Sequence, residues 1–270
     1  EYDRDIFNEN VVKKLNVESI QESNNISRAI LKIFNSEEIR QKVQNILECF
    51  IDAKEVGSLI NIDPFNFKSI EKIINESISI FDYELKAKLL PLLKCASILS
   101  KKYDVVVTNP PYMGNTYMAK NIKDFVNNNY NIANSDLFSA FILKTISLTQ
   151  KDGYIGLITP YVWLYIKSYE HLRRNLINKV NLETLVQLEY NAFEAACVPI
   201  CTFTMKNILS NNNGIYINLS DFRGADNQPI KLLEAINSKE CNYKFYRNFQ
   251  NFSKIPGCSI AVSYTHLTLP

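Results

Sequence analysis

The chain has 270 residues, 46% of them hydrophobic, and 30 Lys+Arg against 28 Asp+Glu give a formal net charge of +2. This length can bury the core of one large domain or two small ones, and the balanced charge excludes a histone-like polycation. No apolar run reaches the roughly 18 residues of a membrane-spanning helix, and no segment reads as a signal peptide. We therefore expect a globular, cytoplasmic protein with reduced thiols and no membrane contact.

Glycine and cysteine usage restricts the possible ligands. None of the 7 glycines belongs to a G-x-G pair, which excludes a P-loop or a Rossmann-type phosphate cradle within this chain. The 6 cysteines lack C-x-x-C spacing and are accompanied by only 2 histidines, so we expect no zinc site and no other metal centre. Cys197 and Cys201 are interpreted as small core residues.

The first hundred residues are predicted to be helical. From Ile26 to about Ser100, apolar residues recur at the spacing of amphipathic helices. Ser36 and the two glutamates after it predict a helix start, because a hydroxyl cap and early carboxylates suit the free N–H groups there. Asp63-Pro64 predicts a turn, and Pro91 predicts a kink or a restart in the last helix.

Beyond residue 101, short β-branched runs alternate with helical segments, which predicts an α/β fold with a mixed sheet that ends on an antiparallel edge. The continuous apolar run of the first strand predicts burial on both of its faces. Asn213-Gly214 predicts a hairpin before the last strand. In chain order the expected elements are a strand at Tyr103 to Thr108, a helix from Ser135 to about Gln150, a strand at Tyr154 to Thr159, a helix from Tyr169 to about Asn178, and strands at Leu182 to Leu188, Val198 to Lys206 and Ile215 to Leu219.

The first strand is followed by Asn109-Pro110-Pro111-Tyr112, the N-P-P-Y motif. The prolines fix φ near about −65° and move Asn109 out of the helical region, so the Asn109 amide oxygen and the Pro110 carbonyl become two rigid acceptors. Ligands of open α/β sheets bind beyond the carboxyl ends of strands, where this motif lies. The structural alternative is a tight turn after a strand.

Two fixed neutral acceptors beside an aromatic ring suit a planar NH2 group. Such an amine is a poor nucleophile because its lone pair is delocalised, and accepting both of its hydrogens frees that lone pair for attack. The Tyr112 ring can stack on a planar base, a contact worth about 1–3 kcal/mol. The motif therefore predicts activation of an exocyclic amine or an amide.

The segment from Tyr103 to Tyr112 resembles the catalytic motif of amino-group methyltransferases that use S-adenosylmethionine, and the rest resembles the gamma class of N6-adenine DNA methyltransferases. This resemblance implies a Rossmann-like methyltransferase fold, duplex DNA with a flipped adenine as substrate, and no metal. It implies that the four residues of the N-P-P-Y motif are catalytic and that Tyr112 also binds the base. Asp136 and Phe141, in a motif V-like helix, would contact the cofactor, and Phe193, which opens a motif VIII-like segment, would pack on the flipped base.

A narrower resemblance extends over nearly the whole chain. Segments that include Asp52 to Ser58, Asn191 to Asn207 and Ser220 to Gly224 resemble the PglX family of adenine-specific methyltransferases in BREX phage-resistance systems. The resemblance implies DNA methylation in phage defence or a restriction-modification type system, alongside other BREX proteins.

The chain departs from that family at both ends. The family's glycine-rich cofactor loop and its acidic residue for the ribose have no equivalent here, so we expect a fragment that is inactive alone. We assign residues 1–100 to a helical insertion, 101–225 to the catalytic core, and 226–261 to the start of a target-recognition region. Residues 262–270 read as a non-native tail.

Two other functions fit the same residues. One is methylation of a different NH2 group, such as a protein glutamine amide, which offers the same two hydrogens; the helical insertion and the Phe193 segment favour a flat base. The other is a non-catalytic DNA-binding or assembly subunit with a methyltransferase fold. The intact N-P-P-Y motif argues against the loss of catalysis.

Several candidate side chains also have structural explanations. Phe141 and Phe193 can be core residues, and Asp136 can be a helix cap. The others are interpreted as a packing residue (Trp163), an exposed helical residue (His171) and solvated basic pairs with a possible phosphate contact (Lys101-Lys102, Arg173-Arg174).

Overall fold

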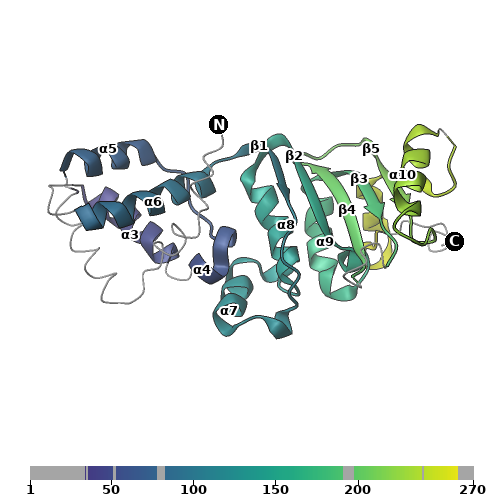
Figure 1. Ribbon diagram of the computed structural model, residues 1–270, viewed down its shortest axis with the longest axis horizontal. Coiled ribbons are helices and arrows are strands. Elements are labelled where there is room, and N and C mark those ends of the chain that lie inside the picture. The colour runs from purple at the N-terminus through teal and green to yellow at the C-terminus, as the bar shows by residue number, and fades with distance from the viewer. Residues whose placement is uncertain are drawn as a thin grey trace. The chain divides into compact units, whose positions relative to one another are not determined.

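The computed structural model describes residues 34, 36–50, 53–77, 83–190, 198–238 and 240–260. The chain divides into two compact units, Glu1–Lys101 and Lys102–Pro270, of which the first is helical and the second contains the sheet (Figure 1). Among the described residues, no helix combines the length and apolar character needed to cross a membrane.

The helical unit follows the predicted pattern. Ser36 occupies the N-cap position, so the predicted helix start is confirmed, but its hydroxyl makes no capping hydrogen bond; the helix buries Val43, Ile46 and Leu47 on one face. The last helix runs through Pro91 without ending, so the predicted restart is wrong; buried leucines on both sides of the proline hold the helix in place. The described helices of this unit are α3 (Glu37–Cys49), α4 (Ala53–Val56), α5 (Phe67–Ser77) and α6 (Tyr83–Ser100).

The second unit is built on a six-stranded mixed sheet, with strand order β1-β2-β4-β3-β5-β6. Strands β1 and β2 are parallel, as are β3 and β5, whereas β4 is antiparallel to both of its neighbours and β6 is antiparallel to β5. The predicted α/β class, with a mixed sheet ending on an antiparallel strand, is confirmed. The strands are β1 (Tyr103–Thr108), β2 (Thr149–Pro160), β3 (Asn181–Gln187), β4 (Ile200–Lys206), β5 (Asn213–Asn218) and β6 (Lys244–Asn248).

The hairpin predicted between β4 and β5 is wrong. Strand β4 is paired on both sides, with β2 and β3, so β5 pairs with β3 and β6 instead. Gly214 lies inside β5 rather than in a turn, and a Cβ at this position would lie 2.1 Å from the Leu182 carbonyl oxygen. Glycine is therefore needed here for the close approach of two strands.

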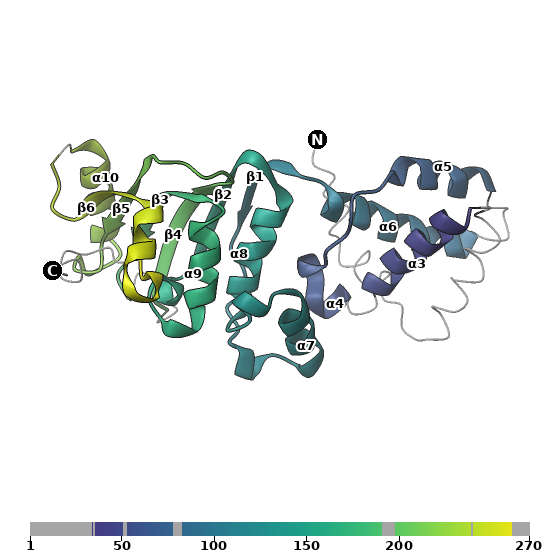
Figure 2. The same cartoon turned by 180° about the vertical axis from the view of Figure 1, so that it is seen from behind.

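Helices α8 (Leu137–Leu148) and α9 (Glu170–Ile177) lie against one face of the sheet, in front of it in Figure 2. Both begin within two residues of the predicted positions. Helices α7 (Lys120–Asn129) and α10 (Asn227–Asn237) and strand β6 have no counterpart in the sequence prediction. The core between helices and sheet includes Phe138, Ile142, Leu172, Leu176, Ile155, Leu157, Leu185 and Phe203.

Strand β1 is not buried on both faces, contrary to the prediction. Val105 and Val107 point to the same face and are 58% and 73% exposed. The described helices α8 and α9 cover the opposite face, against which Ile155 and Leu157 of β2 are buried. A continuous apolar run therefore marks a strand here but does not show that both faces are covered.

The junction between α8 and β2 also differs from the prediction. The helix ends at Leu148, and β2 begins at Thr149 and includes Asp152-Gly153. Asp152 has a φ of 65°, and a Cβ on Gly153 would lie 2.7 Å from the Asp104 carbonyl oxygen. The pair forms an irregularity within the strand, where the register against β1 shifts, rather than a turn before it.

Of the range 226–261, the described residues 226–238 and 240–260 belong to the same compact unit as the sheet. Strand β6 pairs with β5, and Phe249, Phe252 and Ile260 join the main core. The assignment of this range to target recognition stays a prediction, as do the functional roles of the other ranges.

Candidate functional site

Four chain segments meet at one edge of the sheet. Because β4 is antiparallel to both β2 and β3, strands β1, β2 and β3 all end at this edge and β4 begins there. The N-P-P-Y motif follows β1, residues 161–166 follow β2, and residues 188–190 follow β3. The Tyr161 N–H donates to the Pro199 carbonyl, at 2.7 Å, and so joins the segment after β2 to the one before β4.

The N-P-P-Y motif presents its two polar side chains to solvent. Asn109 is exposed, Tyr112 is 36% exposed, and Pro110 is buried. The Tyr112 hydroxyl donates to Asn109 Oδ1, at 2.9 Å, and lies 3.2 Å from the Ile158 carbonyl in β2. Burial raises the pKa of Tyr112, so the phenol stays protonated and holds the Asn109 side chain beside its own ring.

Asp136 caps α8 and fixes the residue that follows the motif. Its Oδ1 accepts from the Phe138 N–H at 3.2 Å and from the Met113 N–H at 3.0 Å. The Met113 carbonyl in turn accepts from the Leu137 N–H, at 3.0 Å. Burial raises the pKa of the Asp136 carboxyl, and its bonds to backbone N–H groups oppose that rise. The helix-cap interpretation is confirmed, and the same carboxylate positions the N-P-P-Y motif.

A short stack of aromatic rings supports Tyr112 from inside. Phe138, fully buried in α8, meets the Tyr112 ring edge to face with centroids 6.3 Å apart. Phe138 also stacks on Tyr169, with ring centroids 5.7 Å apart. Phe141, predicted to touch the cofactor, lies three residues further along α8 and is half-buried.

Arg173 is not on a solvated face, contrary to the prediction; it is 1% exposed. Its guanidinium donates to the carbonyls of Trp163 and Ile166, each at 2.8 Å, and to that of Gly257 at 2.8 and 3.0 Å. The planar fork of arginine can satisfy three carbonyls at once. Arg173 thereby ties the segment after β2 to the end of the described chain.

Several other structural interpretations are confirmed. Trp163 is fully buried against Phe203 and donates to Thr159 Oγ1 at 3.1 Å. Cys201 is fully buried, and His171 is exposed. Arg174 is exposed and pairs with Glu170 at 2.7 Å, and Lys101 and Lys102 are exposed as well.

Phe193 and Cys197 lie outside the described residues, and so does the rest of the segment at 191–197. The residues that flank this segment, Tyr190 and Val198, are at the same sheet edge as the N-P-P-Y motif. The role of Phe193 in binding a base stays a prediction. Within the described ranges, no three His, Cys, Asp or Glu side chains gather as metal ligands would.

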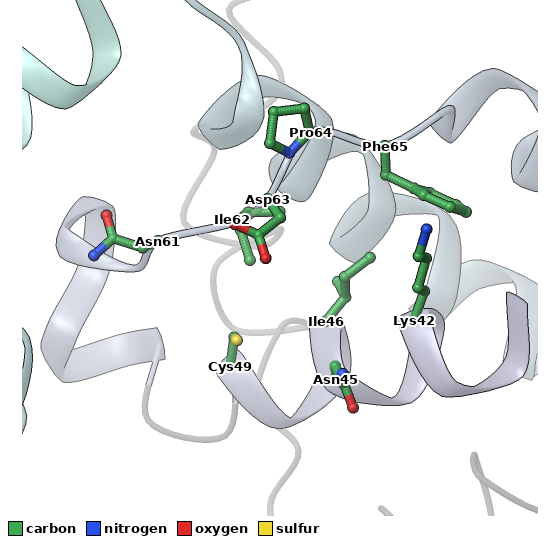
Figure 3. A pocket seen from close by; sticks show the side chains of 9 residues that line it. All are labelled: Lys42, Asn45, Ile46, Cys49, Asn61, Ile62, Asp63, Pro64 and Phe65. Atoms are coloured by element: carbon green, nitrogen blue, oxygen red, sulfur yellow. The ribbon is translucent and has the colours of Figure 1, made fainter. Parts of the chain in front are cut away.

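The helical unit holds a pocket of about 350 Å³ (Figure 3). One side comes from α3 and the other from the segment before α5. Lys42 lies over the Phe65 ring, 4.8 Å from its centroid, and burial, with the nearby carboxylates, raises the pKa of Cys49. None of the predicted site residues lines the pocket, whose walls are Lys42, Asn45, Ile46, Cys49, Asn61, Ile62, Asp63, Pro64 and Phe65.

Comparison with known proteins assigns the chain to a family. Residues 13–193 match the family model described as Eco57I restriction-modification methylase. The chain belongs to the Eco57I restriction-modification methylase family. The predicted resemblance to DNA-modifying methyltransferases is thus confirmed at the level of the family.

Two curated relatives of this Eco57I-type chain are adenine-specific methyltransferases. PglX of Lacticaseibacillus casei (strain Zhang) is 30% identical over 231 residues, which is 81% of this chain and 19% of PglX. BrxX of Escherichia coli O9:H4 (strain HS) is 32% identical over 222 residues, which is 80% of this chain and 18% of BrxX. The chain thus spans about a fifth of the length of these relatives.

Solved structures resemble the chain more distantly. A structure of a type I R-M system matches 97% of this chain and 64% of its own chain, with 14% identity and a TM-score of 0.47. The type I restriction-modification methyltransferase subunit from Streptococcus thermophilus matches 84% and 58%, with 14% identity and a TM-score of 0.45. At these scores the two structures add nothing to the family assignment.

Sequence reasoning missed three residues that shape the site of this Eco57I-type chain. Phe138 supports the Tyr112 ring, Arg173 fixes the segment after β2, and Tyr165 is an exposed ring in that segment. Phe138 sits in the same short motif as Phe141, so its spacing from Asp136 could have marked it. Arg173 and Tyr165 carry no comparable signal, because their environment is made by residues distant in sequence.

Proposed function

We propose that the chain carries the amine-binding part of an adenine-specific DNA methyltransferase, which transfers a methyl group to N6 of adenine in duplex DNA. The observation that carries the proposal is the N-P-P-Y motif at the carboxyl end of β1, with Asn109 and Tyr112 exposed and hydrogen-bonded to each other. Membership of the Eco57I methylase family and the similarity to PglX and BrxX support adenine in DNA as the substrate.

In the proposed mechanism, Asn109 Oδ1 and the Pro110 carbonyl accept the two hydrogens of N6. The nitrogen then loses its conjugation with the ring and its lone pair becomes available for attack. Asn109 Oδ1 already accepts one hydrogen bond, from the Tyr112 hydroxyl at 2.9 Å. The incoming amine replaces that donor, and the Tyr112 hydroxyl keeps the Ile158 carbonyl, 3.2 Å away, as its acceptor.

The adenine must leave the duplex to reach these acceptors, at a cost of about a few kcal/mol for unstacking and unpairing. Stacking on Tyr112 offsets part of this cost. Phe138 holds the Tyr112 ring from behind, so the ring is in place before the base arrives. Phe193 is proposed to cover the other face of the base.

S-adenosylmethionine supplies the methyl group when bound. The described residues suit its adenine end, because Phe141 is a half-buried ring on α8, the helix that begins beside the N-P-P-Y motif. Asp136 is proposed to contribute a second contact through Oδ2, since its Oδ1 is engaged by backbone N–H groups. We propose duplex DNA and other BREX proteins as partners in phage defence, which implies a cytoplasmic location.

Methyl transfer by an Asn109→Ala variant of the full-length protein tests the proposal. We expect incorporation of labelled methyl groups into DNA to fall at least about a hundredfold, within the range by which a preorganised polar group can change kcat. The fold should be preserved, because Asn109 is exposed. Near-normal transfer by a variant with an unchanged circular dichroism spectrum would reject the mechanism.

A further inference from the structure

The loop that follows β2 presents aromatic rings at the same sheet edge as the N-P-P-Y motif. In this post-β2 loop, residues 161–166, Trp163 and Leu164 are fully buried, whereas Tyr165 is 48% exposed and Tyr161 is half-buried. The Tyr161 and Tyr165 rings lie 6.0 Å apart between centroids, with their planes at 46°. The buried residues anchor the loop, and the two tyrosines form a paired aromatic surface.

This aromatic surface is held in place by hydrogen bonds to the backbone of its own loop. Arg173 donates to the carbonyls of Trp163 and Ile166, at 2.8 Å each. The Tyr161 N–H donates to the Pro199 carbonyl at 2.7 Å. A surface fixed in this way loses little conformational entropy when a planar ligand packs on it.

The surface adjoins the proposed base site. The Tyr112 hydroxyl lies 3.2 Å from the carbonyl of Ile158, which is three residues before the first residue of the post-β2 loop. Burial raises the pKa of Tyr112, Tyr161 and Tyr165, the last to about 12, and the Cys201 thiol contributes to all three shifts. The three phenols therefore remain neutral at physiological pH.

We propose that Tyr165, backed by Tyr161, stacks on the DNA base next to the adenine that enters the N-P-P-Y site. The inference rests on the proposed function. Extrusion of a base breaks the stacking of its neighbour, and an exposed aromatic ring can replace the lost contact. Stacking of this kind tolerates any base, because every base has a π-face. Lys167, exposed directly after the loop, is suited to the adjoining phosphate.

Fluorescence and affinity measurements with the full-length protein test this contact. The probe is a DNA duplex that contains the site methylated by the wild-type protein, found by mapping methylated adenines, with 2-aminopurine replacing the base beside the target. In the wild type, stacking on Tyr165 should quench the probe. Tyr165→Ala should raise its fluorescence and weaken binding about tenfold, within the range measured for loss of one base–aromatic stack.

Three further variants separate stacking from folding. Tyr165→Phe keeps the ring and should behave as the wild type. Tyr165→Leu keeps an apolar side chain against Tyr161 and should lose quenching without losing thermal stability. Tyr246→Ala removes a ring that is 47% exposed on β6, at the other end of the sheet from β1, and should leave both readouts unchanged.

The possible failures can be told apart. If the wild type methylates the duplex but Tyr165→Ala binds it with the same Kd and the same probe fluorescence, the stacking contact is wrong and the proposed function stands. If the wild type neither binds nor methylates DNA, both are wrong.

Discussion

The Tyr112 side chain combines two functions that substitution can separate. Its ring is proposed to stack on adenine, whereas its hydroxyl bonds to the same Asn109 oxygen that is proposed to receive N6. Tyr112→Phe keeps the ring and removes a competing donor, so we expect methyl transfer to stay within about threefold of the wild type. Tyr112→Ala removes the stack, and we expect a loss of tenfold or more, since such a contact is worth about 1–3 kcal/mol.

Steady-state methyl transfer and 2-aminopurine fluorescence at the target position measure these effects. The fluorescence of an extruded base should differ between Tyr112→Ala and Tyr112→Phe. A Tyr112→Phe variant as inactive as Tyr112→Ala would show that the hydroxyl, and not the ring, matters for the reaction.

Arg173 illustrates a buried charge that is satisfied by carbonyl groups. Arg173→Met leaves the carbonyls of Trp163 and Gly257 without this donor, whereas the Ile166 carbonyl keeps the Tyr169 N–H at 3.1 Å. Each buried polar group left unsatisfied costs about 1–3 kcal/mol. We expect the free energy of unfolding to fall by about 3 kcal/mol or more in urea titrations.

The neighbouring arginine supplies a matched control. Arg174 is exposed and pairs with Glu170 one helical turn away, and exposed pairs contribute little. Arg174→Met should leave the urea midpoint nearly unchanged. Equal effects of the two substitutions would show that the carbonyl contacts of Arg173 do not stabilise the fold.

At the scale of elements, two glycines of the sheet differ in the space that a Cβ atom would have. A Cβ on Gly214 in β5 would lie 2.1 Å from the Leu182 carbonyl oxygen, whereas a Cβ on Gly156 in β2 would meet only Val107 methyl groups at 3.5 and 3.6 Å. Gly214→Ala should therefore force β5 away from β3 and destabilise the protein by about 1–3 kcal/mol, as overpacking does. Gly156→Ala should be neutral or slightly stabilising.

Urea midpoints of the two glycine variants, together with amide hydrogen exchange in β3 and β5, give the comparison. Exchange in these strands should accelerate in Gly214→Ala only. Equal stability of the two variants would mean that the β3–β5 pairing adapts to a methyl group without cost.

Element boundaries followed the sequence where the signal was local. The N-cap at Asp136 and the break between helices at Asp63-Pro64 depend on a few adjacent residues, and both occur in the structure. The predicted hairpin between β4 and β5 is absent, because β4 is paired with β2 on one side and with β3 on the other. Asn213-Gly214 lies inside β5, so this dipeptide marked neither the position of a turn nor the partner strand.

At the scale of the whole molecule, β1 is the outermost of the described strands on its side of the sheet, and one of its faces carries exposed apolar side chains. Val105 is 58% exposed, and β1 ends the order of the described strands. Such an edge favours pairing between molecules. Val105→Lys in the 270-residue chain should lower concentration-dependent association, measured by light scattering, without lowering the melting temperature.

Leu209→Lys is the control for this effect. Leu209 is 54% exposed but lies in the connection between β4 and β5 rather than on a strand edge. It should change association less than Val105→Lys does. If both lysines act alike, added charge and not the strand edge explains the result.

Much of the candidate site was predictable from the sequence because the motif is contiguous. Asn109, Pro110 and Tyr112 are neighbours, the prolines restrict the backbone locally, and a strand before the motif predicts its place at a sheet edge. Arg173 was misjudged because its basic character suggests solvent, whereas its carbonyl partners lie up to 84 residues away.

The helical first part, the α/β second part and the N-P-P-Y motif after a strand could be predicted from the amino-acid order, since these features depend on local periodicity and on backbone restrictions of single residues. Tertiary structure alone decided that β5 joins β3, that one face of β1 is exposed, and that Arg173 fixes the post-β2 loop beside Tyr112. These features depend on hydrogen bonds and packing between segments far apart in the chain, and local preferences contain no information about such partners.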